Sequence, residues 1–338
     1  MPRHLQRSWA TGARYNTMTA TTARHDTVLL QESVDALAIN PTDTVVDATL
    51  GGAGHFGLLL EKLGKGGVLV GIDADHEAIM RAQAVVDAIP EANRPTVHLV
   101  EDNFGNFASI MAKTGISSPD KVLFDLGWSG FQLVAGRGFS FKTDEPLLMT
   151  YGDPETAETT AADLVNHLSE TSLADMIYAL GEERFARGIA RSIVALREEA
   201  PIMTTFALVE AIEKGVPAWY RHRRLHPATK TFQALRIGVN DELGVLRSGL
   251  SAALASLSVG GRVAVITFHS IEDRIVKGMF RDAAYAGAGM MVSKKPIVPS
   301  SAELSKNPRA RSAKLRVFER GVAASPAFSN NTLTSVYA

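Results

Sequence analysis

The chain has no cysteine among its 338 residues, which excludes disulfide bonds and thiolate metal sites. Apolar runs near the ~20 residues that a membrane-spanning helix needs are also missing. Neither acidic nor basic residues are in excess: the formal net charge is −1, so the overall charge of the chain does not attract it to nucleic acid. Any attraction to a polyanion must come from local clusters of Lys and Arg. With 46% hydrophobic residues, the chain is long and apolar enough for one large domain or two ordinary ones.

Acidic residues are absent from residues 1–24, which contain four Arg and many Ser and Thr. This composition is typical of a mitochondrial transit peptide, of a disordered tail, or of a start placed too early, with the initiator at Met18. We favour the tail or the misplaced start, because nothing else in the chain indicates import, and we expect a cytoplasmic protein. Residues 321–338 are expected to form a second disordered tail.

Short β-branched runs alternate with helical stretches in the first half of the chain, and several of them end in an acid. The expected strands are Thr44–Asp47, Val68–Asp73, Val97–Val100 and Lys121–Asp125, with helices over Phe56–Leu63 and Glu77–Ala88. Strands that alternate with helices at this spacing predict an α/β fold with a doubly wound parallel sheet.

The alternation stops near residue 134. Apolar residues then recur at helical spacing over 163–180 and 182–197, and strand character returns only at 262–268 and 314–318. The sheet is therefore expected to be interrupted by a helical insertion. We assign residues 25–133 and 232–320 to the two parts of the sheet domain and 134–231 to an inserted, substrate-recognition domain.

The segment Asp47–His55 joins the first expected strand to a helix and is rich in glycine. Open parallel sheets bind ligands at this place, and glycines let the backbone approach a ligand closely. Asp73 ends the next strand, where an acid can accept hydrogen bonds from ribose hydroxyls. The glycines alone leave two cofactors open, because Gly52, Gly54 and Gly57 also satisfy the dinucleotide pattern of nicotinamide enzymes.

A second candidate motif, Asp125–Gln132, begins where the fourth strand ends. Exocyclic amino groups of nucleobases are poor nucleophiles, because their lone pair is delocalised into the ring. Asp125 is a candidate acceptor for such an amino group, and Trp128 is a candidate ring to stack on the base. As alternatives, Asp125 caps a turn and Trp128 packs in the core.

Several longer segments, taken together with these two motifs, resemble the bacterial 16S ribosomal RNA cytosine-N4 methyltransferases. They occur in order between about His25 and Arg320: His25–Leu30, Gly54–His55, Arg137–Phe141, Gly181–Arg184, His226–Asn240, Phe268–Lys277 and Asn307–Ser312. The resemblance implies a class I methyltransferase, Rossmann-like fold with an inserted helical domain. It also implies S-adenosylmethionine as cofactor and a cytosine of the small ribosomal subunit as substrate.

The resemblance implies roles for particular residues as well. Cofactor contacts are expected at Ala53, Gly54, His55, Asp73, Phe104, Asp125 and Gln132, in addition to Asp47 at the start of the loop. Substrate contacts are expected at Arg137, His226, Arg236, Asn240, His269, Arg309 and Arg311.

Four places depart from the family's pattern: Thr27, Trp128, the pair Gly130–Phe131 and the segment Leu148–Tyr151. The last is expected to lie beside the active site, which leaves two alternatives open. One is a ribosome-assembly factor that keeps the fold with impaired catalysis. The other is a methyltransferase for another RNA or a DNA amino group.

Two basic segments favour an RNA partner. No acid lies between Glu213 and Asp241, whereas that stretch holds Arg221, Arg223 and Arg224, and residues 294–320 contain eight Lys or Arg against two Glu. Trp219 and Tyr220 beside the first cluster can stack on unpaired bases, although core packing is the favoured interpretation for Trp219.

The histidines lack metal-ligand spacing, so no metal is expected. Ser270 and Asp273 are interpreted as a helix cap rather than as parts of a hydrolase triad. No membrane partner is expected, and the oligomeric state stays open, a dimer being one option.

Overall fold

The computed structural model describes residues 27–127 and 130–321. The expectations for residues 1–24, for His25 and for Trp128 concern residues outside these ranges, and so does the tail expected after Gly321.

In the described part of the chain, seven strands form one sheet in the order β3-β2-β1-β4-β5-β7-β6. The pairs that join β3, β2, β1, β4 and β5 are parallel, whereas β7 is antiparallel to both of its neighbours. The strands are β1 Thr44–Asp47, β2 Val68–Asp73, β3 Thr96–Glu101, β4 Lys121–Asp125, β5 Arg262–Thr267, β6 Gly289–Met291 and β7 Lys314–Arg320. The chain order reverses between β1 and β4, which makes a doubly wound sheet and confirms the predicted fold class.

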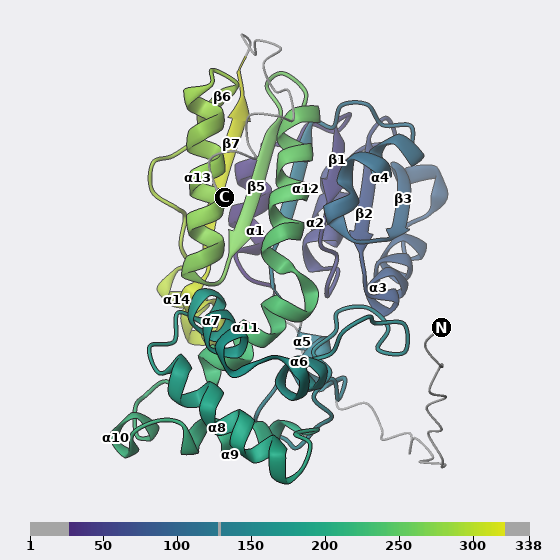
Figure 1. Cartoon of the computed structure of the whole chain (residues 1–338). Helices are drawn as coiled ribbons and strands as arrows, with labels where there is room; N and C mark the ends of the chain where they lie inside the picture. The colour runs from purple at the N-terminus through teal and green to yellow at the C-terminus, as the bar shows by residue number, and fades with distance from the viewer. Residues whose placement is uncertain (1–26, 128–129, 322–338) are drawn as a thin grey trace, which may run out of the picture.

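Helices cover both faces of the sheet (Figure 1). One apolar core lies under α4 (Phe107–Lys113), α12 (Glu242–Ser256) and α13 (Ser270–Tyr285). A second core lies under α1 (Leu30–Leu37), α2 (Gly54–Lys62) and α3 (His76–Asp87) on the opposite face. The central strands are buried from both sides, so they consist of continuous apolar runs rather than alternating ones.

Residues 130–240, between β4 and α12, make up what we call the middle segment. Its helices lie beyond one end of the sheet and have a third core of their own (Figure 1). They are α5 Gly130–Val134, α6 Ala161–His167, α7 Glu170–Gly181, α8 Ala186–Glu199, α9 Thr205–Lys214, α10 Ala218–Arg221 and α11 Ala228–Asn240. α14 (Ser301–Lys306) and the 3₁₀ turn η3 (Pro308–Ser312) follow β6 and lead into β7.

Two local expectations are wrong. The helix expected over 163–180 is two helices, because a capping box of Thr160 and Asp163 starts α6 and the Ser169 hydroxyl caps α7. The cap of α13 is not made by Ser270 and Asp273: the His269 ring accepts from the Glu272 N–H, and the Glu272 side chain accepts in return. The Ser270 hydroxyl instead donates to Glu182 at 2.6 Å.

Candidate active site

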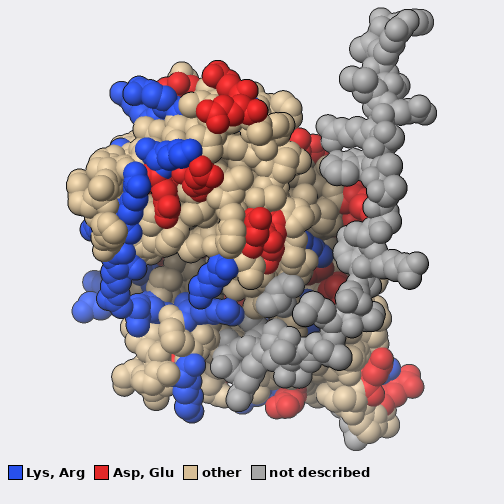
Figure 2. All heavy atoms as spheres, turned by 90° about the horizontal axis from the view of Figure 1, so that it is seen from below, with Lys and Arg blue, Asp and Glu red and all other residues tan. Residues whose placement is uncertain are grey.

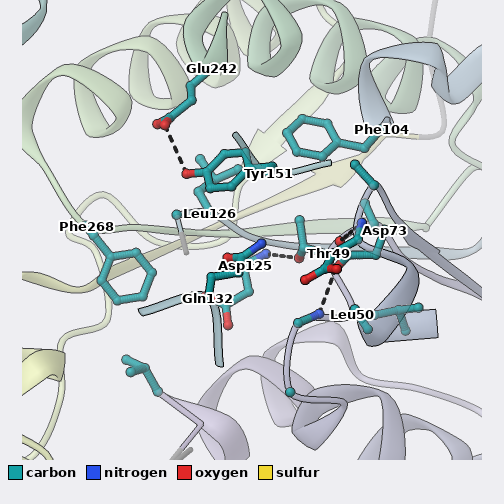
Figure 3. A pocket seen from close by; sticks show the side chains of 18 of the residues that line it. Thr49, Leu50, Asp73, Phe104, Asp125, Leu126, Gln132, Tyr151, Glu242 and Phe268 are labelled. Carbon is teal, nitrogen blue, oxygen red and sulfur yellow. Dashed lines mark hydrogen bonds between the residues drawn. The ribbon is translucent and has the colours of Figure 1, made fainter. Parts of the chain in front are cut away.

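A pocket of about 520 Å³ lies at the carboxyl ends of β1, β2, β4 and β5. The loops after these strands line one side of it, and Tyr151, Arg236 and Asn240 line it from the middle segment. Figure 3 shows this cavity with Asp73, Phe104, Asp125 and Tyr151 among the side chains around it. Its volume is within the usual range for a cofactor or a drug-sized ligand.

The glycine-rich loop after β1 is held in an unusual backbone conformation. Gly51 has φ +48° and Ala53, the residue before α2, has φ +60°. A Cβ at Gly54 would lie only 1.9 Å from the Thr27 hydroxyl and 3.0 Å from the Thr27 Cβ, so a larger residue here requires the Thr27 side chain to move. The loop therefore presents backbone rather than side chains to the pocket at the start of α2.

Asp73 fixes this loop from the neighbouring strand. Its carboxylate accepts from the Gly51 N–H at 2.8 Å and from the Asp75 N–H at 2.9 Å. Burial raises the pKa of Asp73, although the two backbone hydrogen bonds favour its ionised form. A carboxylate has about four acceptor positions, so both oxygens keep a lone pair for a ligand in the pocket.

Asp125 ends β4 and is held by two contacts. Its N–H donates to the Thr49 hydroxyl at 2.6 Å, and its Oδ2 lies 3.4 Å from His55 Nδ1 (Figure 3 shows the first contact). Among the described residues, Asp125 Oδ1 has no hydrogen-bond partner although it is buried. An orphaned acceptor at the edge of a ligand pocket is a position for a donor of the substrate or cofactor.

His55 is buried and interacts with two acids, the half-buried Asp125 and the fully buried Asp47. Burial opposes its charged form, but the hydrogen bond to Asp125 and the charges of both acids outweigh burial and raise the pKa of His55. Burial raises the pKa of Asp47 from 3.8 to about 7, and the Thr49 N–H donates to its Oδ1 at 3.2 Å.

The raised pKa of Asp47 predicts a pH-dependent stability. Between pH 3.8 and about 7 the unfolded chain loses this proton while the folded chain keeps it, so folding becomes weaker as the pH rises. Asp47→Asn removes this titration. Relative to the variant, the wild type is expected to lose up to roughly 4 kcal/mol of unfolding free energy across that window.

Urea denaturation of both proteins at pH 4 to 8 measures this difference, with Asp87→Asn as a control at an exposed acid. Parallel stability curves for the wild type and Asp47→Asn would show that Asp47 ionises normally.

On the other side of the pocket, Glu242 joins two residues of the middle segment. The Arg236 guanidinium donates to both of its oxygens, at 2.7 and 2.9 Å, and the Tyr151 hydroxyl donates to Oε1 at 2.9 Å. Asn240 donates to the Met149 carbonyl and accepts from the Tyr151 N–H, which fixes the segment that departs from the family pattern. Tyr151 of the segment Leu148–Tyr151 is therefore part of the pocket wall.

Glu242, His269 and Glu272 offer ligand atoms within 4.8 Å of one another. A metal there would compete with Arg236, which already occupies both oxygens of Glu242. Glu272 Oε2 accepts backbone N–H groups of Phe268 and His269, and the pKa of Glu272 is lowered: burial raises it, but His269 and Arg236 outweigh burial. The cluster is therefore charge-compensated by the protein itself.

Only some of the residues expected at the site line the pocket. Those that line the pocket are Gly54, His55, Asp73, Phe104, Asp125, Gln132, Arg236, Asn240 and Arg309. Those that do not line it are Asp47, Ala53, Arg137, His226, His269 and Arg311.

Arg137 faces backbone rather than the cavity, since it donates to the Tyr151 carbonyl at 2.8 Å and lies 3.7 Å from Asp75. His226 stacks on Phe141 with ring centroids 4.6 Å apart. Sequence reasoning missed Thr49 and Glu242. The sequence signal for the ion pair was the opposite charge of Arg236 and Glu242, which are six residues apart.

A match to a protein family identifies the class of enzyme to which this pocket belongs. The family model described as "MraW methylase family" matches residues 22–321. The chain belongs to this family. The family prediction made from the motifs is therefore confirmed, and the nicotinamide alternative is wrong.

Two curated relatives support the assignment, and both are named ribosomal RNA small subunit methyltransferase H. The one from Deinococcus radiodurans is 48% identical, over 89% of this chain and 91% of its own length. The one from Brevibacillus brevis is 43% identical, over 90% of this chain and all of its own length. A solved putative methyltransferase from Streptococcus mutans in complex with SAH matches 86% of this chain and 96% of its own, at 11% identity and a TM-score of 0.39.

The chain is thus a methyltransferase that uses S-adenosylmethionine, and the pocket fits that cofactor. The loop at Gly54 offers a close backbone approach, Asp73 keeps acceptor capacity for a ribose, and Phe104 offers an apolar ring beside them. In the part of the chain that the structure describes, no helix has the length and apolar character that crossing a membrane requires.

Proposed function

We propose that the chain methylates the N4 amino group of a cytosine in the decoding centre of 16S ribosomal RNA, within the small subunit and in the cytoplasm. The observation that carries this proposal is the unpartnered Oδ1 of Asp125, buried at the pocket edge between the cofactor loop and the middle segment. The family membership and the names of the relatives support a ribosomal substrate.

Asp125 is the proposed catalytic residue. Its Oδ1 accepts a hydrogen bond from the N4 amino group and thereby orients the nitrogen lone pair toward the methyl donor. The bound cofactor supplies a methyl group on a positively charged sulfur. Once the nitrogen is alkylated its proton becomes acidic and can pass to the Asp125 carboxylate and on to water, so no stronger base is required.

His55 is the proposed positioning residue for Asp125. The imidazole Nδ1 lies 3.4 Å from Oδ2, fixes the orientation of the carboxylate and leaves Oδ1 for the substrate. Arg309 and Arg311 are proposed to bind RNA phosphates beside the pocket, since both are exposed on η3 and Arg309 lines the pocket. Residues 134–231 are proposed to act as the substrate-recognition domain.

Methylation assays with labelled cofactor on small subunits, free 16S RNA and DNA test the proposal. We expect N4-methylcytidine in the ribosomal RNA and none in DNA. Nucleoside mapping by mass spectrometry in a deletion strain is expected to show the loss of one methyl group from one cytosine. Transfer to DNA or to another nucleoside would contradict the proposal, and absence of transfer to every substrate would favour an assembly factor with impaired catalysis.

A further inference from the structure

The tip of the middle segment carries a cluster of aromatic rings and arginines that is separate from the pocket. It consists of Arg184 and Phe185 before α8, Trp219 and Tyr220 of α10, and Arg221, Arg223 and Arg224 at and after the end of α10. None of these residues lines the pocket. We call it the α10 surface.

Trp219 is a large apolar side chain left 56% exposed, so the core packing expected for it is wrong. It is not loose, because Phe185 and Tyr220 pack edge-on against it with centroids 5.9 and 5.7 Å away. The Arg184 guanidinium carbon lies 4.8 Å from the centre of its ring. An indole that is fixed by its neighbours and still open to solvent is pre-ordered for stacking against another flat ring.

The charge around this indole is positive. Arg184, Arg221, Arg223 and Arg224 are all exposed, and the sequence has no acid between Glu213 and Asp241. Glu183, the acid next to Arg184 in the sequence, is fully buried and accepts from the Tyr220 hydroxyl at 2.7 Å. Figure 2 shows Lys and Arg side chains gathered along the left of the view from below, the side on which α10 lies in Figure 1.

We propose that the α10 surface binds an unpaired stretch of RNA, with Trp219 stacked on a base and the arginines on phosphates. The proposal rests on the proposed function and names a second RNA contact of the same enzyme, outside the methyl-transfer pocket. Stacking favours unpaired bases over a duplex, and guanidinium groups favour a polyanion over an apolar protein face. An aromatic ring among arginines matches both features of single-stranded RNA.

Trp219→Ala tests the stacking contact. We expect it to raise the Kd for a single-stranded 16S RNA fragment roughly tenfold, and to leave the affinity for a duplex of equal length within about twofold. Trp219→Phe is expected to retain part of the affinity. The matched control is Tyr285→Ala, which removes a 96% exposed aromatic from the far end of α13 and is expected to change neither Kd.

The triple variant Arg221→Ala/Arg223→Ala/Arg224→Ala tests the phosphate contacts. We expect the slope of log K against log salt to fall by up to about 2, since each phosphate contact on a single strand contributes about 0.7. Arg281→Ala, an exposed arginine of α13, is the control and is expected to leave the slope unchanged.

The outcomes separate this inference from the proposed function. Equal RNA affinity of Trp219→Ala and Tyr285→Ala, with methylation by the wild type intact, would overturn the inference alone. Loss of affinity for the assembled subunit but not for free RNA would also overturn it, because the surface would then contact protein. A wild type that binds RNA through Trp219 without methylating it would overturn the proposed function and leave the inference standing.

Discussion

Asp125→Ala is expected to lower the rate of methyl transfer by about three orders of magnitude, while the protein stays folded. The variant keeps the hydrogen bond to Thr49, which comes from the Asp125 backbone N–H, and loses the contact of the carboxylate with His55. What is lost is the acceptor that orients the amino group and takes up its proton, and such groups contribute about 10² to 10⁴ in rate. Single-turnover kinetics at saturating RNA measures this loss directly.

A second variant tests whether His55 acts on the reaction through Asp125. His55→Ala removes the cation that lies 3.4 Å from Oδ2, so it is expected to slow transfer less than Asp125→Ala does. If His55 acts through Asp125, the double variant is no slower than Asp125→Ala alone. Normal turnover by Asp125→Ala, or additive losses in the double variant, would exclude the arrangement.

The parallel sheet could be predicted from the sequence because its strands are buried on both faces. Such strands appear as short β-branched runs, and the bounds of β1, β2 and β4 match the prediction at every residue. β6 could not be predicted, since Gly289–Met291 has only three residues and exists through its pairing with β7. The break between α6 and α7 depends on caps at Thr160 and Ser169 that apolar spacing does not reveal.

The sheet side of the pocket was equally predictable. Asp73 and Asp125 each end a parallel strand, and the ends of parallel strands meet at one edge of the sheet. On the opposite wall, the resemblance pointed to Arg236, Asn240 and the segment Leu148–Tyr151. Glu242 was not predicted, because it meets Tyr151, 91 residues away, only through tertiary packing. Arg137, which the resemblance implied as a substrate contact, donates to the Tyr151 carbonyl in this structure, and its contact with the substrate stays a prediction.

Asp73→Asn is expected to raise the Kd for S-adenosylmethionine about 10- to 100-fold. The Gly51 and Asp75 N–H groups hold the carboxylate in place, so its remaining lone pairs point to fixed positions in the pocket. An amide of the same shape replaces one acceptor oxygen by a donor, and hydrogen bonds to a charged group are worth about 1.5–3 kcal/mol. Calorimetry on the full chain measures the change.

Asp87→Asn is the matched control for this measurement, because Asp87 is an exposed acid at the end of α3 and does not line the pocket. Its Kd should equal that of the wild type. A Kd for Asp73→Asn within threefold of the wild type would mean that Asp73 only fixes the glycine loop. In that case the variant should lose stability instead, since the Gly51 N–H would lose its charged acceptor. Thermal denaturation of the cofactor-free protein therefore separates cofactor binding by Asp73 from loop fixation.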